Sequence, residues 1–390
     1  MSAHAGRPGF LKYFGTGCVV VLAAALITHA LEDSWIFRHL ENSNLDTWLL
    51  AKKPATSKKV FVVTITDDDY KDLFHGASPL NQELVLRIVQ AIAAAGPRII
   101  GVDLDTSGWN TALVPLPANV PIVWAREFSE DPLPTGLANV LGGSGEGVCF
   151  GLPALMPDED GVIRRYEPLI QSKGGQEEAG FARRTVVGCG DPVAHEKELA
   201  REEARLINFI GDRLAFEHLS STAILALSAV PGWNASNPLK GKIVLLGGAF
   251  RAARDKFFTP VGRMDGVDIL AHTVHSELPG GEVPRPGGGF FFAADLLLGV
   301  LLVAGVWLLP RAWALPVIFV AMPLLAFGAS WAAFQSVGYF ASFVPVLGGV
   351  LIHELIEHVL EHRHLLHERE HLIRERDQLL REREAAIVHS

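Results

Sequence analysis

The C-terminal part of the chain is a seven-residue repeat that directly follows an apolar segment. The blocks 364–370, 371–377 and 378–384 follow one another without a gap, and each has two adjacent apolar residues at its second and third positions. A repeat of seven places these residues on one stripe of a helix, which is best buried against another helix. The stripe consists of Leu365, Leu366, Leu372, Ile373, Leu379 and Leu380. The sequence therefore predicts a coiled coil that forms a homodimer.

Four apolar segments are long enough to cross a bilayer, which needs about 20 mostly apolar residues. They are residues 13–31, 289–309, 312–334 and 337–353. The first lacks a small-x-small cleavage site and is therefore expected to be an uncleaved signal anchor rather than a removed signal. With 49% hydrophobic and 20% charged residues, the chain is too charged to be membrane throughout. Its net charge of −9 and scattered Lys and Arg argue against nucleic acid as a partner.

The Lys and Arg residues that flank these segments predict the orientation of the chain. Arg7, Lys12, Arg311 and the arginines of the coil should all lie on the cytoplasmic side. Residues 1–12 and the coil at 354–390 are therefore expected inside the cell, and residues 32–287 outside. Cys149 and Cys189 fall in the outside region, where an oxidising compartment permits a disulfide, although two unpaired thiols fit the sequence equally well.

The outside region reads as one α/β domain with a mixed or parallel sheet and flanking helices. Its apolar, β-branched runs predict buried strands at 60–66, 98–103 and 242–248. Apolar residues at helical spacing predict helices at 83–95 and 266–278, the first ended by Gly96 and Pro97. Less regular stretches are expected to be irregular surface at 108–145, strand-like at 162–169 and a linker at 279–289.

A series of short motifs runs in order along this domain. They are Val62 to Asp67, Ala95 to Asp103, the Asp158-Glu-Asp-Gly-Val-Ile-Arg-Arg165 turn, Ile207-Asn-Phe-Ile-Gly211, and a final block of Lys240 to Gly247, Asp255, Thr259-Pro260 and Gly266-Val267. In this order the motifs resemble those of the CHASE2 family of extracytoplasmic bacterial sensor domains, in which Ile207 to Gly211 corresponds to a strand.

The resemblance implies a sensor in a bacterial inner membrane, with three membrane spans after the domain and a cytoplasmic output module. The chain departs from the family where Ser78-Pro-Leu-Asn81 stands in place of a Trp-Pro-Trp-Pro-Arg region, and at Asp105, where an aromatic residue is usual. No cyclase, kinase or phosphatase motif is found in the sequence. The chain is therefore not expected to be an enzyme, and a separate cytoplasmic output protein is an expected partner.

Acidic residues follow the predicted strands at their carboxyl ends, where open parallel sheets bind ligands. The candidate ligand-binding residues are Asp67, Asp68, Asp103, Asp105 and Asp255. The alternative is that these acids cap helices and close turns. Since no metal-type spacing is present, neither a metal site nor a cofactor is expected.

The sequence thus predicts a membrane sensor in which the outside domain detects an unknown ligand or protein and signals to the dimeric coil. Two alternatives remain open. One is a membrane scaffold that binds partner proteins on both sides, and the other is a membrane enzyme that uses the acidic crevice. His358 to His362 matches an H-x-x-E-H zinc-peptidase string, but it lies on the coil among charged residues, where a solvated polar face is the simpler interpretation.

Overall fold

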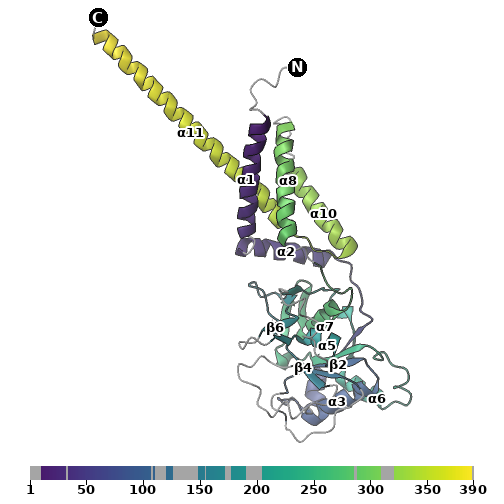
Figure 1. Cartoon of the computed structure of the whole chain (residues 1–390). Helices are drawn as coiled ribbons and strands as arrows, with labels where there is room; N and C mark the ends of the chain where they lie inside the picture. Colours follow the sequence, from purple (N-terminus) through teal and green to yellow (C-terminus); the bar gives the residue numbers. More distant parts are fainter. Residues whose placement is uncertain are drawn as a thin grey trace. The chain divides into compact units, whose positions relative to one another are not determined.

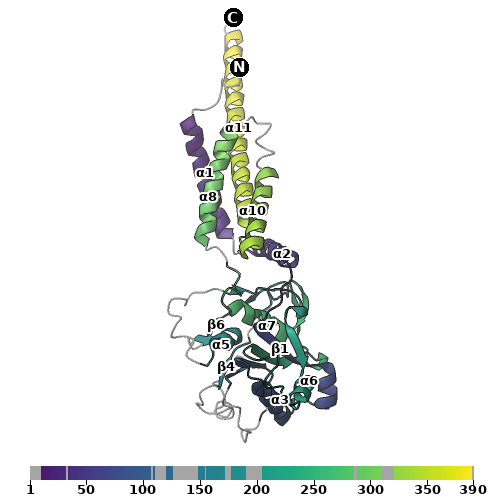
Figure 2. The same cartoon turned by 90° about the vertical axis from the view of Figure 1, so that its right-hand side faces the viewer.

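The computed structural model describes residues 10–31, 34–106, 109, 120–125, 148–153, 155–171, 177–189, 204–284, 288–308 and 320–388. The chain divides into two compact units. One comprises Leu49–Val283, and the other combines Met1–Trp48 with Pro284–Ser390. Figures 1 and 2 show the strands in the first unit and the long helices in the second.

The unit Leu49–Val283 is built on a six-stranded sheet with the order β4-β3-β2-β10-β1-β9. All neighbouring pairs in it are parallel. The strands are β1 (Val60–Ile65), β2 (Ile99–Asp103), β3 (Ile122–Ala125), β4 (Val148–Gly151), β9 (Glu217–Ser220) and β10 (Ile243–Gly248). Strands β1 and β10 are wholly buried, as expected for central strands covered on both faces.

Helices cover both faces of the sheet and give the unit two hydrophobic cores. Alternate residues of β1 divide between them: Phe61 and Val63 pack on one face, and Val60 and Val62 on the other. The first core contains residues of α3 (Gln82–Ala94) and α6 (Ser221–Ser228), and the second those of α5 (Phe181–Val187) and α7 (Gly266–Glu277). The predicted α/β class with a parallel sheet and flanking helices is therefore confirmed.

Shorter elements complete the unit. They are β5 (Arg165–Tyr166) with β8 (Arg205–Leu206), β6 (Leu169–Gln171) with β7 (Glu177–Ala179), β11 (Lys256–Thr259) with β12 (Gly262–Asp265), the π-helix η1 (Asp69–Leu73), and the 3-10 helices η2 (Arg213–Ala215) and η3 (Arg251–Ala253). Cys149 on β4 and Cys189 after α5 form a disulfide with a Cα–Cα distance of 5.3 Å, which resolves the alternative that the sequence left open.

Three local predictions were wrong. The stretch 108–145 was predicted to be irregular surface, but it contains β3, whose Trp124 is fully buried, while 108, 110–119 and 126–147 lie outside the described residues. Strand β3 has only four residues, which are too few for the sequence to show the alternation of a strand. Residues 207–211 are not a strand, because pairing stops at Leu206. Residues 162–169 hold only an isolated bridge at Val162 and short strands.

The second unit consists of α1 (Phe10–Leu31), most of α2 (Trp35–Ala51), α8 (Gly288–Leu308), α10 (Met322–Val337) and α11 (Val344–Val388). Helix α1 packs against α8 and α11. A Cβ atom at Gly17 would lie 2.6 Å from Val303, and one at Gly299 would lie 2.4 Å from Val21. These glycines therefore allow the close approach of α1 and α8, as small residues do in packed membrane helices.

Helix α2 was not predicted from the sequence. Its buried residues Leu45, Trp48 and Leu49 recur at helical spacing, and the Trp48 ring lies 4.8 Å from that of Phe327 and 4.7 Å from that of Trp331. Within the described residues, no single helix has both the length and the apolar character of a membrane span. The pair Gly17–Leu31 and Trp35–Ala51 has this length and apolar character only when the two helices are taken together, and they are bent by 81° relative to each other.

Candidate functional site

The acids that follow β1 serve local structure. Asp67, whose side chain is 52% exposed, accepts a hydrogen bond from the backbone N–H of Arg251 at 2.8 Å, and its Oδ2 lies 3.4 Å from Nε of the same residue. It therefore fixes the start of η3. Asp68 is exposed and makes no capping hydrogen bond at η1. For Asp67, this geometry favours the structural alternative over a ligand contact.

Asp69 was not among the predicted site residues. It is the buried acid of the three consecutive aspartates 67–69. Its carboxylate accepts hydrogen bonds from the backbone N–H groups of Thr66, Ser221 and Thr222 and from the Thr222 hydroxyl. Burial alone would raise the pKa of Asp69, but the hydrogen bonds from Thr222, Thr66 and Ser221 outweigh it and hold the pKa below its ordinary value. Asp69 thus fastens the end of β1 to the first turn of α6.

Asp103 and Asp255 lie near enough for the charge of Asp255 to act on Asp103. Asp103 is the last residue of β2, and it pairs in register with Gly247 of β10. Asp255 lies between η3 and β11, and its carboxylate rests on Gly266, where an added Cβ would come within 2.2 Å of Oδ2. The absence of a side chain at Gly266 therefore leaves room for this carboxylate. Asp105 is exposed.

The pKa values of both carboxyl groups are raised above the ordinary value of an aspartate. Burial, and next the charge of Asp255, raise the pKa of Asp103 from 3.8 to about 7. Burial, and next the charge of Asp265, raise the pKa of Asp255. Perturbed carboxyl groups that cluster at the carboxyl edge of a parallel sheet are typical of functional sites. Within the described parts of the chain, no group of three or more His, Cys, Asp or Glu side chains is arranged to hold a metal ion.

Two further acids lie at the start of α7. Asp265 is buried and its Oδ1 lies 2.7 Å from Nζ of Lys256. Asp268 is 1% exposed, and neither of its carboxylate oxygens has a hydrogen-bond partner among the described residues. Burial raises the pKa of Asp268 to about 7. Nε2 of His218 lies 3.5 Å from Oδ1 of Asp268, and burial lowers the pKa of that histidine.

Asp103→Asn is expected to raise the thermal stability of the protein above pH 7 and to leave it unchanged below pH 4. An acid whose folded pKa is raised loses stability as the pH rises from its unfolded pKa to its folded one, here from 3.8 to about 7, and stays penalised at higher pH. Asparagine carries no such penalty. Melting temperatures of the full chain at pH 4 and pH 8 measure the difference.

Asp105→Asn is the matched control, because Asp105 follows the same strand but is exposed. An equal gain for Asp103→Asn at both pH values would show that the buried carboxylate is not penalised for ionising.

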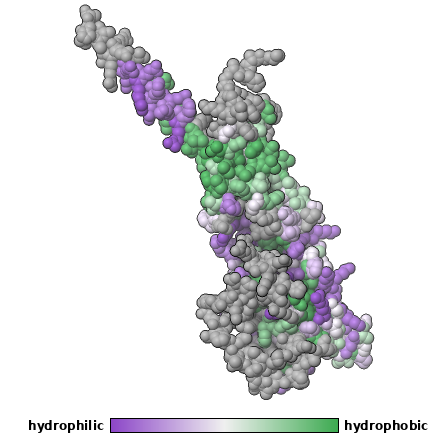
Figure 3. Space-filling view, viewed as in Figure 1, coloured by the Kyte–Doolittle hydropathy of each residue, from purple (hydrophilic) through white to green (hydrophobic). Residues whose placement is uncertain are grey.

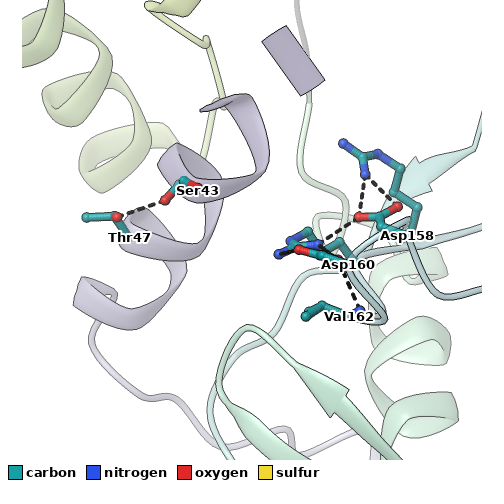
Figure 4. A network of polar contacts seen from close by, with 7 residues as sticks. Ser43, Thr47, Asp158, Asp160 and Val162 are labelled. Atoms are coloured by element: carbon teal, nitrogen blue, oxygen red, sulfur yellow. Dashed lines mark hydrogen bonds and ion pairs between the residues drawn. The ribbon is translucent and has the colours of Figure 1, made fainter. Parts of the chain in front are cut away.

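The Asp158 to Arg165 turn is an ion-pair network, shown in Figure 4. Arg164, whose side chain is 3% exposed, donates to Asp160 at 2.7 and 2.8 Å and to Asp158 at 3.0 Å. Arg165 also donates to Asp158, at 2.7 Å, and the backbone N–H of Val162 donates to Asp160 at 3.1 Å. The hydrogen bonds from Arg164 lower the pKa of Asp160. These carboxylates are used inside the turn, which is therefore structural.

A second network surrounds Glu277 at the end of α7. Its carboxylate is fully buried and accepts from the Tyr166 hydroxyl at 2.7 Å, from Arg183 at 2.9 Å and from Arg205 at 3.0 Å. These partners come from β5, α5 and β8, so one side chain joins four elements. Glu277 was not predicted from the sequence, since an acid in the last turn of a predicted helix gives no sign of burial.

The fold is that of a doubly wound α/β protein, and its candidate ligand site is the acidic edge at Asp103 and Asp255. The CHASE2 domain model matches residues 19–309, which is more than half of the chain. The chain therefore belongs to the CHASE2 family, a family of sensory extracytoplasmic domains. No significant match was found among curated proteins or among solved structures.

Proposed function

We propose that the protein is a signal-transduction sensor of the bacterial inner membrane. In this proposal the α/β unit lies outside the cell and detects a stimulus. Four membrane spans, predicted at 13–31, 289–309, 312–334 and 337–353, connect it to a dimeric cytoplasmic coil. The chain has no enzymatic role of its own, and the coil acts on a separate cytoplasmic output protein.

Two observations support the compartment and the membrane. The disulfide between Cys149 and Cys189 favours an oxidising, extracytoplasmic location for the α/β unit. The helical unit exposes large apolar side chains on several helices, as lipid-facing surfaces do: they include Val19 and Leu26 of α1, Leu297 and Leu301 of α8, and Leu324 and Leu325 of α10. Figure 3 shows apolar residues gathered over this unit, and hydrophilic ones along the projecting part of α11.

The single observation that carries the proposal is the continuity of α11. This helix runs for 45 residues from Val344 to Val388. Its first part packs against α1 and α8, with Val350 and His353 buried. Its later part exposes Leu365 and Leu372 at 56% and 64%. A rigid helix that is packed at one end and carries an apolar stripe at the other can transmit a movement of the packed helices to the coil.

The ligand site that we propose is a crevice between Asp103 and Asp255. Two partly buried carboxylates suit a cationic ligand, because a bound cation favours their ionised form. Binding of such a ligand should lower the pKa of Asp103 in the folded protein. The loss of stability caused by ionisation of Asp103 should then end at a lower pH. Recovery of a stoichiometric bound protein, without any such shift, would instead favour a scaffold.

The orientation is tested by cysteine labelling in intact cells. A cysteine in place of the exposed Glu282 should react with a membrane-impermeant reagent, whereas one in place of Arg383 should not react until the cells are opened. The reason is that the Lys and Arg flanks favour a cytoplasmic coil and an outside α/β unit. Both variants are made with Cys18 replaced by Ser, because Cys18 is a free thiol. Labelling at position 383 from outside would refute the topology.

A further inference from the structure

Two chain segments connect the α/β unit to the helices, and one buried side chain binds both of them. The entering segment follows α2 at Lys52, and the leaving segment passes Gly281 before α8. Asn208, which is 7% exposed, accepts a hydrogen bond from Nζ of Lys52 at 2.6 Å through Oδ1. Its Nδ2 donates to the carbonyl oxygen of Gly281 at 2.7 Å. The two segments are thus joined through a single amide.

The backbone around Asn208 is attached to the last turns of α7. The N–H of Asn208 donates to Oγ of Ser276 at 2.9 Å, and that hydroxyl donates to the carbonyl oxygen of His272 at 2.8 Å. The N–H of Ile210 points to Nδ1 of His272 at 3.5 Å. Burial lowers the pKa of His272 to about 3, so its imidazole is neutral and can accept this hydrogen bond.

The entering segment is held along the same loop by its backbone. The N–H of Ala55 donates to the carbonyl oxygen of Ile210 at 2.7 Å, and the N–H of Ser57 donates to that of Ala215 at 2.9 Å. At its other end, α7 begins at Gly266 against the carboxylate of Asp255. Helix α7 therefore runs from the proposed crevice to the loop that carries Asn208.

We propose that Asn208 is a clamp that holds the entering and leaving segments together on the end of α7. This inference rests on the proposed function for its consequence, because it gives the route by which a displacement of α7 at the crevice reaches both connecting segments. An amide suits the position, since it accepts from Lys52 and donates to Gly281 at the same time. A carboxylate could only accept, and an alkyl side chain could do neither.

The clamp is tested by hydrogen–deuterium exchange on the full chain in lipid nanodiscs. Asn208→Ala should speed exchange about tenfold in both 52–57 and 279–283, since the first segment loses a partly buried hydrogen bond and the second a buried one. Asn208→Asp keeps the acceptor for Lys52 and should speed exchange only in 279–283. Lys52→Met removes the other arm and should speed exchange only in 52–57. The two single-arm variants decide the question if the alanine variant does not fold.

Asn237→Ala is the matched control. Its amide also donates to backbone carbonyls, those of Ala95 at 3.0 Å and Trp233 at 3.1 Å, but touches neither connecting segment. It should leave both segments unchanged. The clamp is overturned if Asn208→Ala affects only residues near 208, or if either single-arm variant fails to loosen its own segment. The proposed signalling route predicts that Asn208→Ala also changes disulfide crosslinking of a cysteine placed at position 383. Faster exchange in both segments without that change would uphold the clamp and overturn the signalling route.

Discussion

Leu365→Asp together with Leu372→Asp is expected to abolish crosslinking of a cysteine placed at Arg383 in the full chain. Both leucines lie on the exposed apolar stripe of α11. In a dimeric coil this stripe is buried, and truncating a buried leucine alone costs about 2 to 5 kcal/mol. An aspartate adds the cost of burying a charge beside its copy in the partner. Disulfide crosslinking in membranes, followed on non-reducing gels, measures the effect.

The matched control is His367→Asp with Arg374→Asp. These positions are also seven residues apart but lie on the opposite side of α11. Arg374 makes only an exposed ion pair with Glu370, at 3.3 Å, of a kind worth about 0.3 to 0.5 kcal/mol. Crosslinking should persist in the control. Undiminished crosslinking in the leucine variant would mean that other parts of the chain hold the dimer, and that the coil is not the contact between copies.

Glu277→Ala is expected to lower the free energy of unfolding by about 3 to 5 kcal/mol, the usual cost of removing one partner of a buried ion pair. The substitution leaves the Tyr166 hydroxyl and the guanidinium groups of Arg183 and Arg205 without the carboxylate that they share. For a unit of this size the melting temperature should fall by about 10 °C. Thermal unfolding of the full chain, followed by circular dichroism, measures it.

Two substitutions separate the buried network from ordinary polar contacts. Glu217→Ala removes a carboxylate that is 49% exposed and lies 2.7 Å from Nζ of Lys242, and it should cost no more than about 1 kcal/mol. Tyr166→Phe removes one hydrogen bond from the network and should cost about 1 kcal/mol. Equal melting temperatures for Glu277→Ala and Glu217→Ala would show that Glu277 is not a structural centre.

The strands and helices of the core could be predicted because local patterns of apolar residues in the sequence indicate their burial. Strands β1, β2 and β10 are near-continuous apolar runs that end at acids or glycines, and α3 has a clear apolar face. Their order could not be predicted. Strand β10 inserts between β1 and β2, and no local pattern records which distant strand completes a sheet.

The candidate site was predictable in part for the same reason. Asp103 and Asp255 meet because the sheet topology brings the carboxyl edge of β2 to the start of α7. Asp67 does not join them, because Arg251 of a distant loop binds it. Asp69 and Asp268 were not predicted as site residues. The burial of an acid depends on the residues that pack over it, and these residues lie far away in the sequence.

The position of β10 also determines when the α/β unit can fold during synthesis. Ile243 of β10 pairs with both Val60 of β1 and Ile99 of β2. The two central strand pairs of the sheet can therefore form only after almost the whole unit has been synthesised. Pairing between such distant segments is slow. Until it occurs, the edge of β1 that will face β10 is unpaired, and an unpaired apolar edge is prone to aggregate. The strands on the two sides of β10 can therefore join into one sheet only when β10 has been made.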